Sequence, residues 1–172
     1  MTTLAPSPVQ PILDEIRREA AATRRMLEVL PEARLSWKPH PKSHTLGQLA
    51  RHVATLPSGF AQMLAGEAVD FATIDLKVGQ PQTRAELLAA LDQGVRDAEQ
   101  AFGAWDAAEL GRTWRALKNG VELMAMPKSA VLRNLLCNHL VHHRGQLSVY
   151  LRLLDVPVPA VYGPTADENP FG

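Results

Sequence analysis

Residues 128–154 read KSAVLRNLLCNHLVHHRGQLSVYLRLL, and they carry the clearest structural pattern in this 172-residue chain. Apolar residues and two histidines recur there at steps of three and four, the spacing that keeps side chains on one face of an α-helix. Pro127 precedes the stretch and Pro157 follows it, as expected for a helix that is bounded on both sides. The predicted inward stripe consists of Leu132, Leu136, His139, His143, Leu147, Tyr150 and Leu154.

Three earlier segments show the same helical periodicity. The first spans about residues 9–30. The second begins after Thr45, which matches a capping box with Gln48, and Pro57 should kink or shorten it. The third opens after a second capping box at Thr83. Four helices of about twenty residues predict an all-α fold, a four-helix bundle.

The segments around these helices are less regular. Asn119-Gly120 is a favoured type I′ turn pair, so we predict a small β-hairpin before the last helix, with an irregular loop as the alternative. The proline-rich end, from residue 156 onward, should pack back over the bundle as an extended strap. The length suits one domain, and we expect residues 1–172 to form a single one.

The composition limits the classes of protein to which the chain can belong. Its 18 basic residues balance 18 acidic ones, so we expect no binding to nucleic acid or to an anionic membrane surface. No apolar run is long enough to span a bilayer, and residues 1–8 lack the basic and apolar regions of a signal peptide. Cys137 is the only cysteine, which excludes an internal disulfide and suits a reducing compartment. We expect a soluble, cytoplasmic protein.

Two histidines on the predicted inward stripe suggest a metal site. His139 and His143 are four residues apart, so their Cβ atoms should lie about 5–6 Å from each other on one helix face. Imidazoles placed in this way can bind one ion at about 2.0–2.1 Å. An imidazole without a partner is costly in an apolar core, and a metal would satisfy both rings. The alternative is that backbone carbonyls or other side chains satisfy them.

The other four histidines are less clearly placed. His52 lies on the apolar face of the second helix, so it could face the last helix and supply a third ligand. Three neutral ligands would leave coordination positions open, as in catalytic rather than structural sites. His142 is three residues from His139, so that pair stays open, although the stripe favours the partner four residues away. His40 and His44 fall in a proline-bounded loop and are expected to be ordinary exposed side chains, although His44 could reach the mouth of a site near the start of the second helix.

Two segments contain histidines in a characteristic order: His139-Leu-Val-His-His-Arg-Gly-Gln146, and Leu-Ala-Arg-His-Val, which contains His52. Together they resemble the signature of the DinB family of metalloenzymes. The likeness continues in Trp37-Lys-Pro-His-Pro-Lys-Ser-His44 and in Pro159-Ala-Val-Tyr-Gly-Pro164, so it covers most of the chain. The resemblance implies a bundle of the up-down-down-up type and a homodimer. It also implies a divalent metal, zinc first and nickel next, whose ligands are His52, His139 and His143.

Proteins of this family include bacillithiol and mycothiol S-transferases and a mycothiol-dependent maleylpyruvate isomerase. The resemblance therefore implies a metal-dependent S-transferase, with a small-molecule thiol and an electrophile as its substrates. A hydrolase that uses metal-bound water is the first alternative, but it needs a general base, and the histidine stripes carry no carboxylate. A non-enzymatic metal-binding stress protein is the second alternative.

Overall fold

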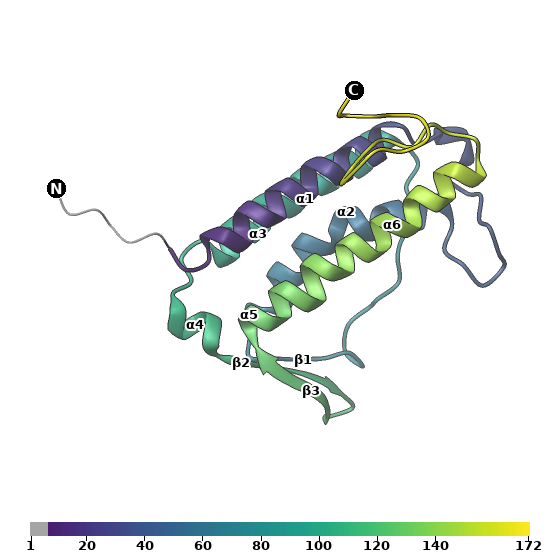
Figure 1. Cartoon of the computed structure of the whole chain (residues 1–172). Coiled ribbons are helices and arrows are strands. Elements are labelled where there is room, and N and C mark those ends of the chain that lie inside the picture. The colour runs from purple at the N-terminus through teal and green to yellow at the C-terminus, as the bar shows by residue number, and fades with distance from the viewer. Residues whose placement is uncertain (1–6) are drawn as a thin grey trace.

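The computed structural model describes residues 7–172. Residues 1–6 lie outside the described part of the chain. They include most of the segment that we expected not to be a signal peptide, and the first six residues of the expected domain. Long helices dominate the fold (Figure 1). They are α1 (Gln10–Glu28), α2 (Leu46–Met63), α3 (Arg84–Phe102) and a last helix in three consecutive parts, α5 (Lys128–Ala130), η2 (Val131–Cys137) and α6 (Asn138–Leu153). The minor elements are η1 (Glu32–Arg34), α4 (Ala107–Gly111), β1 (Ala68–Asp70), β2 (Thr113–Lys118) and β3 (Val121–Pro127).

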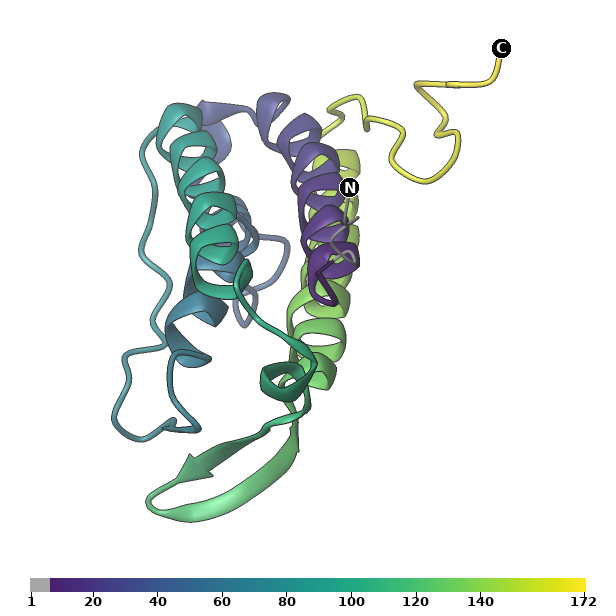
Figure 2. The same ribbon diagram turned by 90° about the vertical axis from the view of Figure 1, so that its left-hand side faces the viewer.

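The four long helices run up, down, down and up, so the predicted bundle is confirmed (Figure 2). The Arg84 side chain at the start of α3 donates to the carbonyl of Glu28 at the end of α1, at 2.8 Å. At the other end of the bundle, Val9 and Phe102 belong to one buried cluster. α1 and α3 are therefore antiparallel, and the loop of residues 71–83 crosses the length of the bundle between α2 and α3.

The predicted start of α2 is confirmed, whereas the predicted shortening at Pro57 is not. Thr45 and Gln48 form the predicted capping box, which fixes where α2 begins. Pro57 does not shorten the helix, because α2 continues to Met63. The neighbouring helix packs closely there: a Cβ atom at Gly94 would lie 3.3 Å from the carbonyl oxygen of Ala54. Tight packing by α3 offsets the cost of a proline inside a helix.

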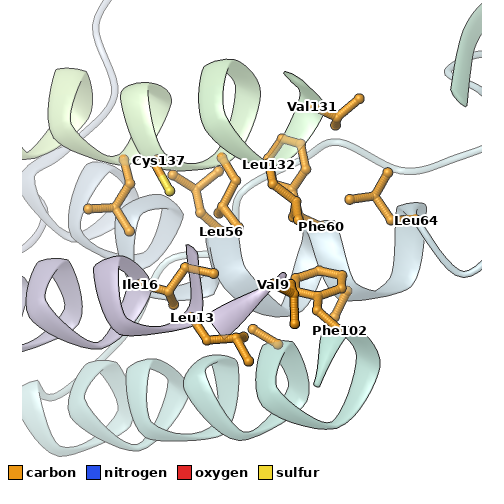
Figure 3. Packing of buried hydrophobic residues seen from close by; sticks show 14 of the residues in the cluster. Val9, Leu13, Ile16, Leu56, Phe60, Leu64, Phe102, Val131, Leu132 and Cys137 are labelled. Carbon is orange, nitrogen blue, oxygen red and sulfur yellow. The ribbon is translucent and has the colours of Figure 1, made fainter. Parts of the chain in front are cut away.

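The core consists of two clusters between the helices. Figure 3 shows the one near the start of α1, which includes Val9, Leu13, Ile16, Phe60, Phe102, Leu132 and Cys137. Burial raises the pKa of the Cys137 thiol to about 12, so this thiol is an inert part of the core. The second cluster lies toward the end of α1 and includes Leu27, Leu30, Leu46, Leu87, Leu91, Leu147 and Leu151.

A small sheet closes the end of the bundle beside η2 (Figure 1). β2 and β3 form the predicted hairpin, and Asn119 and Gly120 both have the positive φ that a type I′ turn requires. β1 was not predicted; it pairs in parallel with β2. The carboxylate of Asp70, at the end of β1, accepts hydrogen bonds from the backbone N–H groups of the two turn residues. This contact holds the turn against β1.

The proline-rich C-terminal segment packs back on the bundle, as predicted (Figure 1). Val158 and Ala160 are buried. Arg144 of α6 is buried as well, and its guanidinium pairs with Glu19 of α1 at 2.6 Å and donates to the hydroxyl of Tyr162 at 2.6 Å. Arg144 therefore joins α6, α1 and the C-terminal segment.

Candidate metal centre

Three of the six histidines meet between α2 and α6. The Nε2 atoms of His139 and His143 lie 2.6 Å apart, and Nε2 of His52 lies 3.4 Å from Nε2 of His139. One nitrogen from each of the three rings lies within 4.8 Å of the other two. The capping box at the start of α2 sets the position of His52, and the helical spacing of four sets the other pair. The predicted trio therefore converges, and it could hold a metal ion.

The buried face of the last helix differs from the predicted stripe. On α6 it consists of Leu140, Arg144, Leu147 and Leu151, whereas His139 and His143 are only half-buried. The difference comes from η2, a π-helix over residues 131–137. A π-helix has more residues per turn than an α-helix, so the residues that follow it face a different side from the one that a continuous α-helix would give them. The two histidines therefore lie at the edge of the core, and not among its buried residues as the predicted inward stripe implied.

Each of the three imidazoles is favoured in its neutral form. Burial lowers the pKa of His52 to about 4, and repulsion from the other two rings contributes to the shift. Burial likewise lowers the pKa of His139 and of His143. A neutral ring is the form that binds a metal, so protons compete weakly for these nitrogens near neutral pH.

Hydrogen bonds set the tautomers of the pair on α6. Oε1 of Gln146 lies 2.7 Å from Nδ1 of His143, so that nitrogen carries the proton. His139 hydrogen-bonds the backbone carbonyl of Leu135, which takes up its single N–H. With Nδ1 protonated on both rings, the two Nε2 atoms present lone pairs 2.6 Å apart, an arrangement that a bound cation would stabilise. This donor set fits a divalent transition metal.

The remaining histidines lie outside the trio. His142 is exposed, and its Nε2 contacts the amide nitrogen of Gln146 at 3.1 Å, so it supports the glutamine that orients His143. His40 is exposed, as expected. His44 is also exposed but lies at the edge of the cavity that leads to the trio. The group of histidines that could hold a metal ion therefore contains His143, and not His142, beside His139.

A cavity of about 720 Å³ opens onto the three histidines. One wall consists of apolar side chains from α2, the last helix and the sheet, and the opposite wall is the loop of residues 71–83. The apolar residues are Leu56, Phe60, Met63, Phe71, Leu76, Val78, Trp114, Met124 and Leu135. The sequence analysis did not identify this cavity, because part of its wall comes from the loop of residues 71–83 and from the sheet, which lack helical periodicity. Its size suits a small organic ligand.

Replacement of Gln146 by leucine is expected to weaken zinc binding by about 10–100-fold, because Nδ1–H of His143 loses its acceptor and the ring loses its orientation. Competition against a chromophoric chelator measures the affinity. Gln62→Leu is the matched control, since Gln62 is an exposed glutamine of α2 outside the site. An unchanged zinc affinity in Gln146→Leu would show that the amide does not position the ring.

Comparisons with known proteins find relatives of this chain in sequence and in fold. The sequence profile of the DinB family matches residues 4–169. The uncharacterized protein YrdA of Bacillus subtilis strain 168 is 27% identical over 158 residues, which cover 87% of this chain and 85% of YrdA.

Two solved structures have the same fold. A DinB-like protein of Bacillus cereus ATCC 10987 is 24% identical to this chain and superimposes with a TM-score of 0.68. The match covers 90% of this chain and 97% of that protein. A DinB-like protein of Bacillus subtilis is 20% identical, with a TM-score of 0.65, and the match covers 94% of this chain and 96% of that protein.

No helix within residues 7–172 is both long and apolar enough to cross a membrane.

Proposed function

Because the chain belongs to the DinB family, we propose that it binds one divalent metal ion through His52, His139 and His143 and acts as a metal-dependent S-transferase. Zinc is the metal we expect first and nickel next, since imidazole nitrogen suits both. The convergence of three Nε2 atoms at the mouth of a mostly apolar cavity carries this proposal.

A metal bound by three histidines keeps open positions, and it would lower the pKa of a coordinating low-molecular-weight thiol. The protein's own residues then contribute positioning. His139 and His143 are oriented by Leu135 and Gln146, and so present their lone pairs without rearrangement. The apolar wall of the cavity would hold the electrophile and exclude water from the thiolate.

A thiol-transfer assay tests the enzymatic part. Zinc-loaded protein is mixed with bacillithiol, mycothiol or glutathione and with a chlorinated aromatic acceptor. We expect thioether formation that depends on both zinc and thiol, and that is lost in His139→Ala. The absence of thiol-dependent turnover with all three thiols would contradict the transferase assignment while leaving metal binding intact.

Metal-assisted hydrolysis is the second candidate, and Asp75 favours it. Among the described residues that line the cavity, Asp75 supplies the only carboxylate. A hydrolase would need such a general base. Asp75→Asn separates the two functions: it should leave thiol transfer unchanged, but it should abolish ester hydrolysis if Asp75 is the base.

We also propose that the protein is a cytoplasmic homodimer. Val149 and Leu153 on α6 are more than half exposed, at 57% and 58%, and could pack against a second copy. Light scattering should then give twice the chain mass of 18.8 kDa. A monomer at all concentrations would contradict the dimer.

A further inference from the structure

Arg51 places an exposed cationic group next to the candidate metal centre. Arg51 immediately precedes His52 on α2 and lines the same cavity. Its guanidinium carbon would lie 3.8 Å from a Cβ atom at Gly79, so the side chain extends across to the loop of residues 71–83. Within residues 7–172 the guanidinium forms no ion pair. An arginine so placed can hold an anion in a bidentate manner.

The loop opposite supplies a second cation. Lys77 also lines the cavity and forms no ion pair within the described part of the chain. Asp75 is the one opposing charge there, and its Oδ1 accepts a hydrogen bond from the backbone N–H of Lys77 at 2.9 Å. Two cations against one carboxylate leave the charged part of the lining with one net positive charge.

Beyond the histidines the cavity becomes apolar. From His52 to Phe60 along α2 is about 12 Å at 1.5 Å per residue, and over that length the lining passes from Arg51 and His52 to Leu56 and then to Phe60. Trp114 and Met124 of the hairpin close the far end. The lining of the cavity is therefore amphipathic: it combines the charged side chains of Arg51, Asp75 and Lys77 with apolar and aromatic ones.

A glycine leaves room in this apolar part. Gly59 lies inside α2 and lines the cavity, and a Cβ atom built there would meet no atom within 4 Å. Glycine within a helix costs about 1 kcal/mol relative to alanine. A side chain at residue 59 would therefore fill the cavity without clashing with the bundle.

We propose that the cavity binds a molecule with one carboxylate group and an apolar body, that Arg51, aided by Lys77, holds the carboxylate beside the three histidines, and that the apolar body extends past Gly59 toward Trp114. If the protein is the proposed transferase, this ligand is its substrate class. That assignment as a substrate rests on the proposed function. The binding itself requires neither thiol nor turnover.

Calorimetric titration with three probes of equal chain length tests the proposal. Octanoate, octanol and octylamine are titrated into the full-length protein, as purified and after zinc loading. We expect octanoate to bind most tightly in both preparations. Arg51→Gln should weaken octanoate binding by at least about tenfold, the size of a charge-assisted hydrogen bond. Arg34→Gln is the matched control, because Arg34 is exposed in η1 and lies outside the cavity.

A second pair of variants tests the apolar part. Gly59→Leu should abolish octanoate binding, whereas Gly59→Ala should retain it, and both should fold because helix propensity improves. Equal affinity for the three probes, no octanoate binding, or full affinity in either Arg51→Gln or Gly59→Leu would overturn the proposal. Octanoate binding without thiol-dependent turnover would contradict only the proposed transferase function.

Discussion

His139→Ala is expected to lose stoichiometric metal binding, with zinc affinity falling by more than about 100-fold. This exceeds the loss of about 10–100-fold that is typical when a residue that only orients a metal ligand is replaced. His139 is the central member of the trio, since its Nε2 lies 2.6 Å from that of His143 and 3.4 Å from that of His52. Its removal leaves two nitrogens that come from different helices. Metal analysis after equilibrium dialysis measures the occupancy.

His142→Ala is the control for this experiment. His142 is three residues from His139 on the same helix, but it is exposed and its ring lies outside the trio. It should retain one metal ion per chain, with an affinity reduced only through the support that it gives to Gln146. Full occupancy in His139→Ala, or complete loss in His142→Ala, would contradict the assignment of ligands.

Arg144→Leu is expected to lower the free energy of unfolding by about 3–5 kcal/mol, because it leaves a buried carboxylate without its partner. The side chains of Arg144 and Glu19 are only 3% and 11% exposed, and their charged atoms lie 2.6 Å apart. The variant also removes a hydrogen bond to Tyr162 and so loosens the C-terminal segment. Urea denaturation of the metal-free protein measures the change.

The double variant Glu19→Leu with Arg144→Leu distinguishes a charge effect from a packing effect. When both charges are removed together, no uncompensated carboxylate remains, and apolar side chains often replace a buried ion pair at little cost. Most of the lost stability should therefore return. If the double variant is as unstable as Arg144→Leu, the loss comes from packing and not from the stranded carboxylate.

The sequence was sufficient to predict the helices and their order, because local signals determine them. Thr45 and Thr83 cap α2 and α3 where expected. Asn119-Gly120 forms the predicted turn, since positive φ at both positions is a local property of these residue types. The histidine trio could be predicted as well, because helical spacing and the resemblance both pointed to it.

The parts that could not be predicted depend on tertiary contacts. No sequence pattern marks a π-helix, so the rotation that moves His139 to the edge of the core was missed. β1 is three residues long and forms only because β2 lies beside it. The cavity wall at Lys77 and Gly79 comes from an irregular loop, and the position of that loop depends on its contacts with α2, including the contact of Arg51 with Gly79. The proposed ligand contacts therefore emerge only from the fold.

X-ray absorption spectroscopy of the zinc-loaded, full-length protein tests the metal centre most directly. Three histidines predict nitrogen scatterers at about 2.0–2.1 Å with the multiple-scattering pattern of imidazole. Loss of that pattern in His139→Ala, and its retention in His142→Ala, would agree with His52, His139 and His143 as ligands. A first shell without imidazole, or one that contains sulfur from Cys137 in the thiol-free protein, would contradict the three-histidine site.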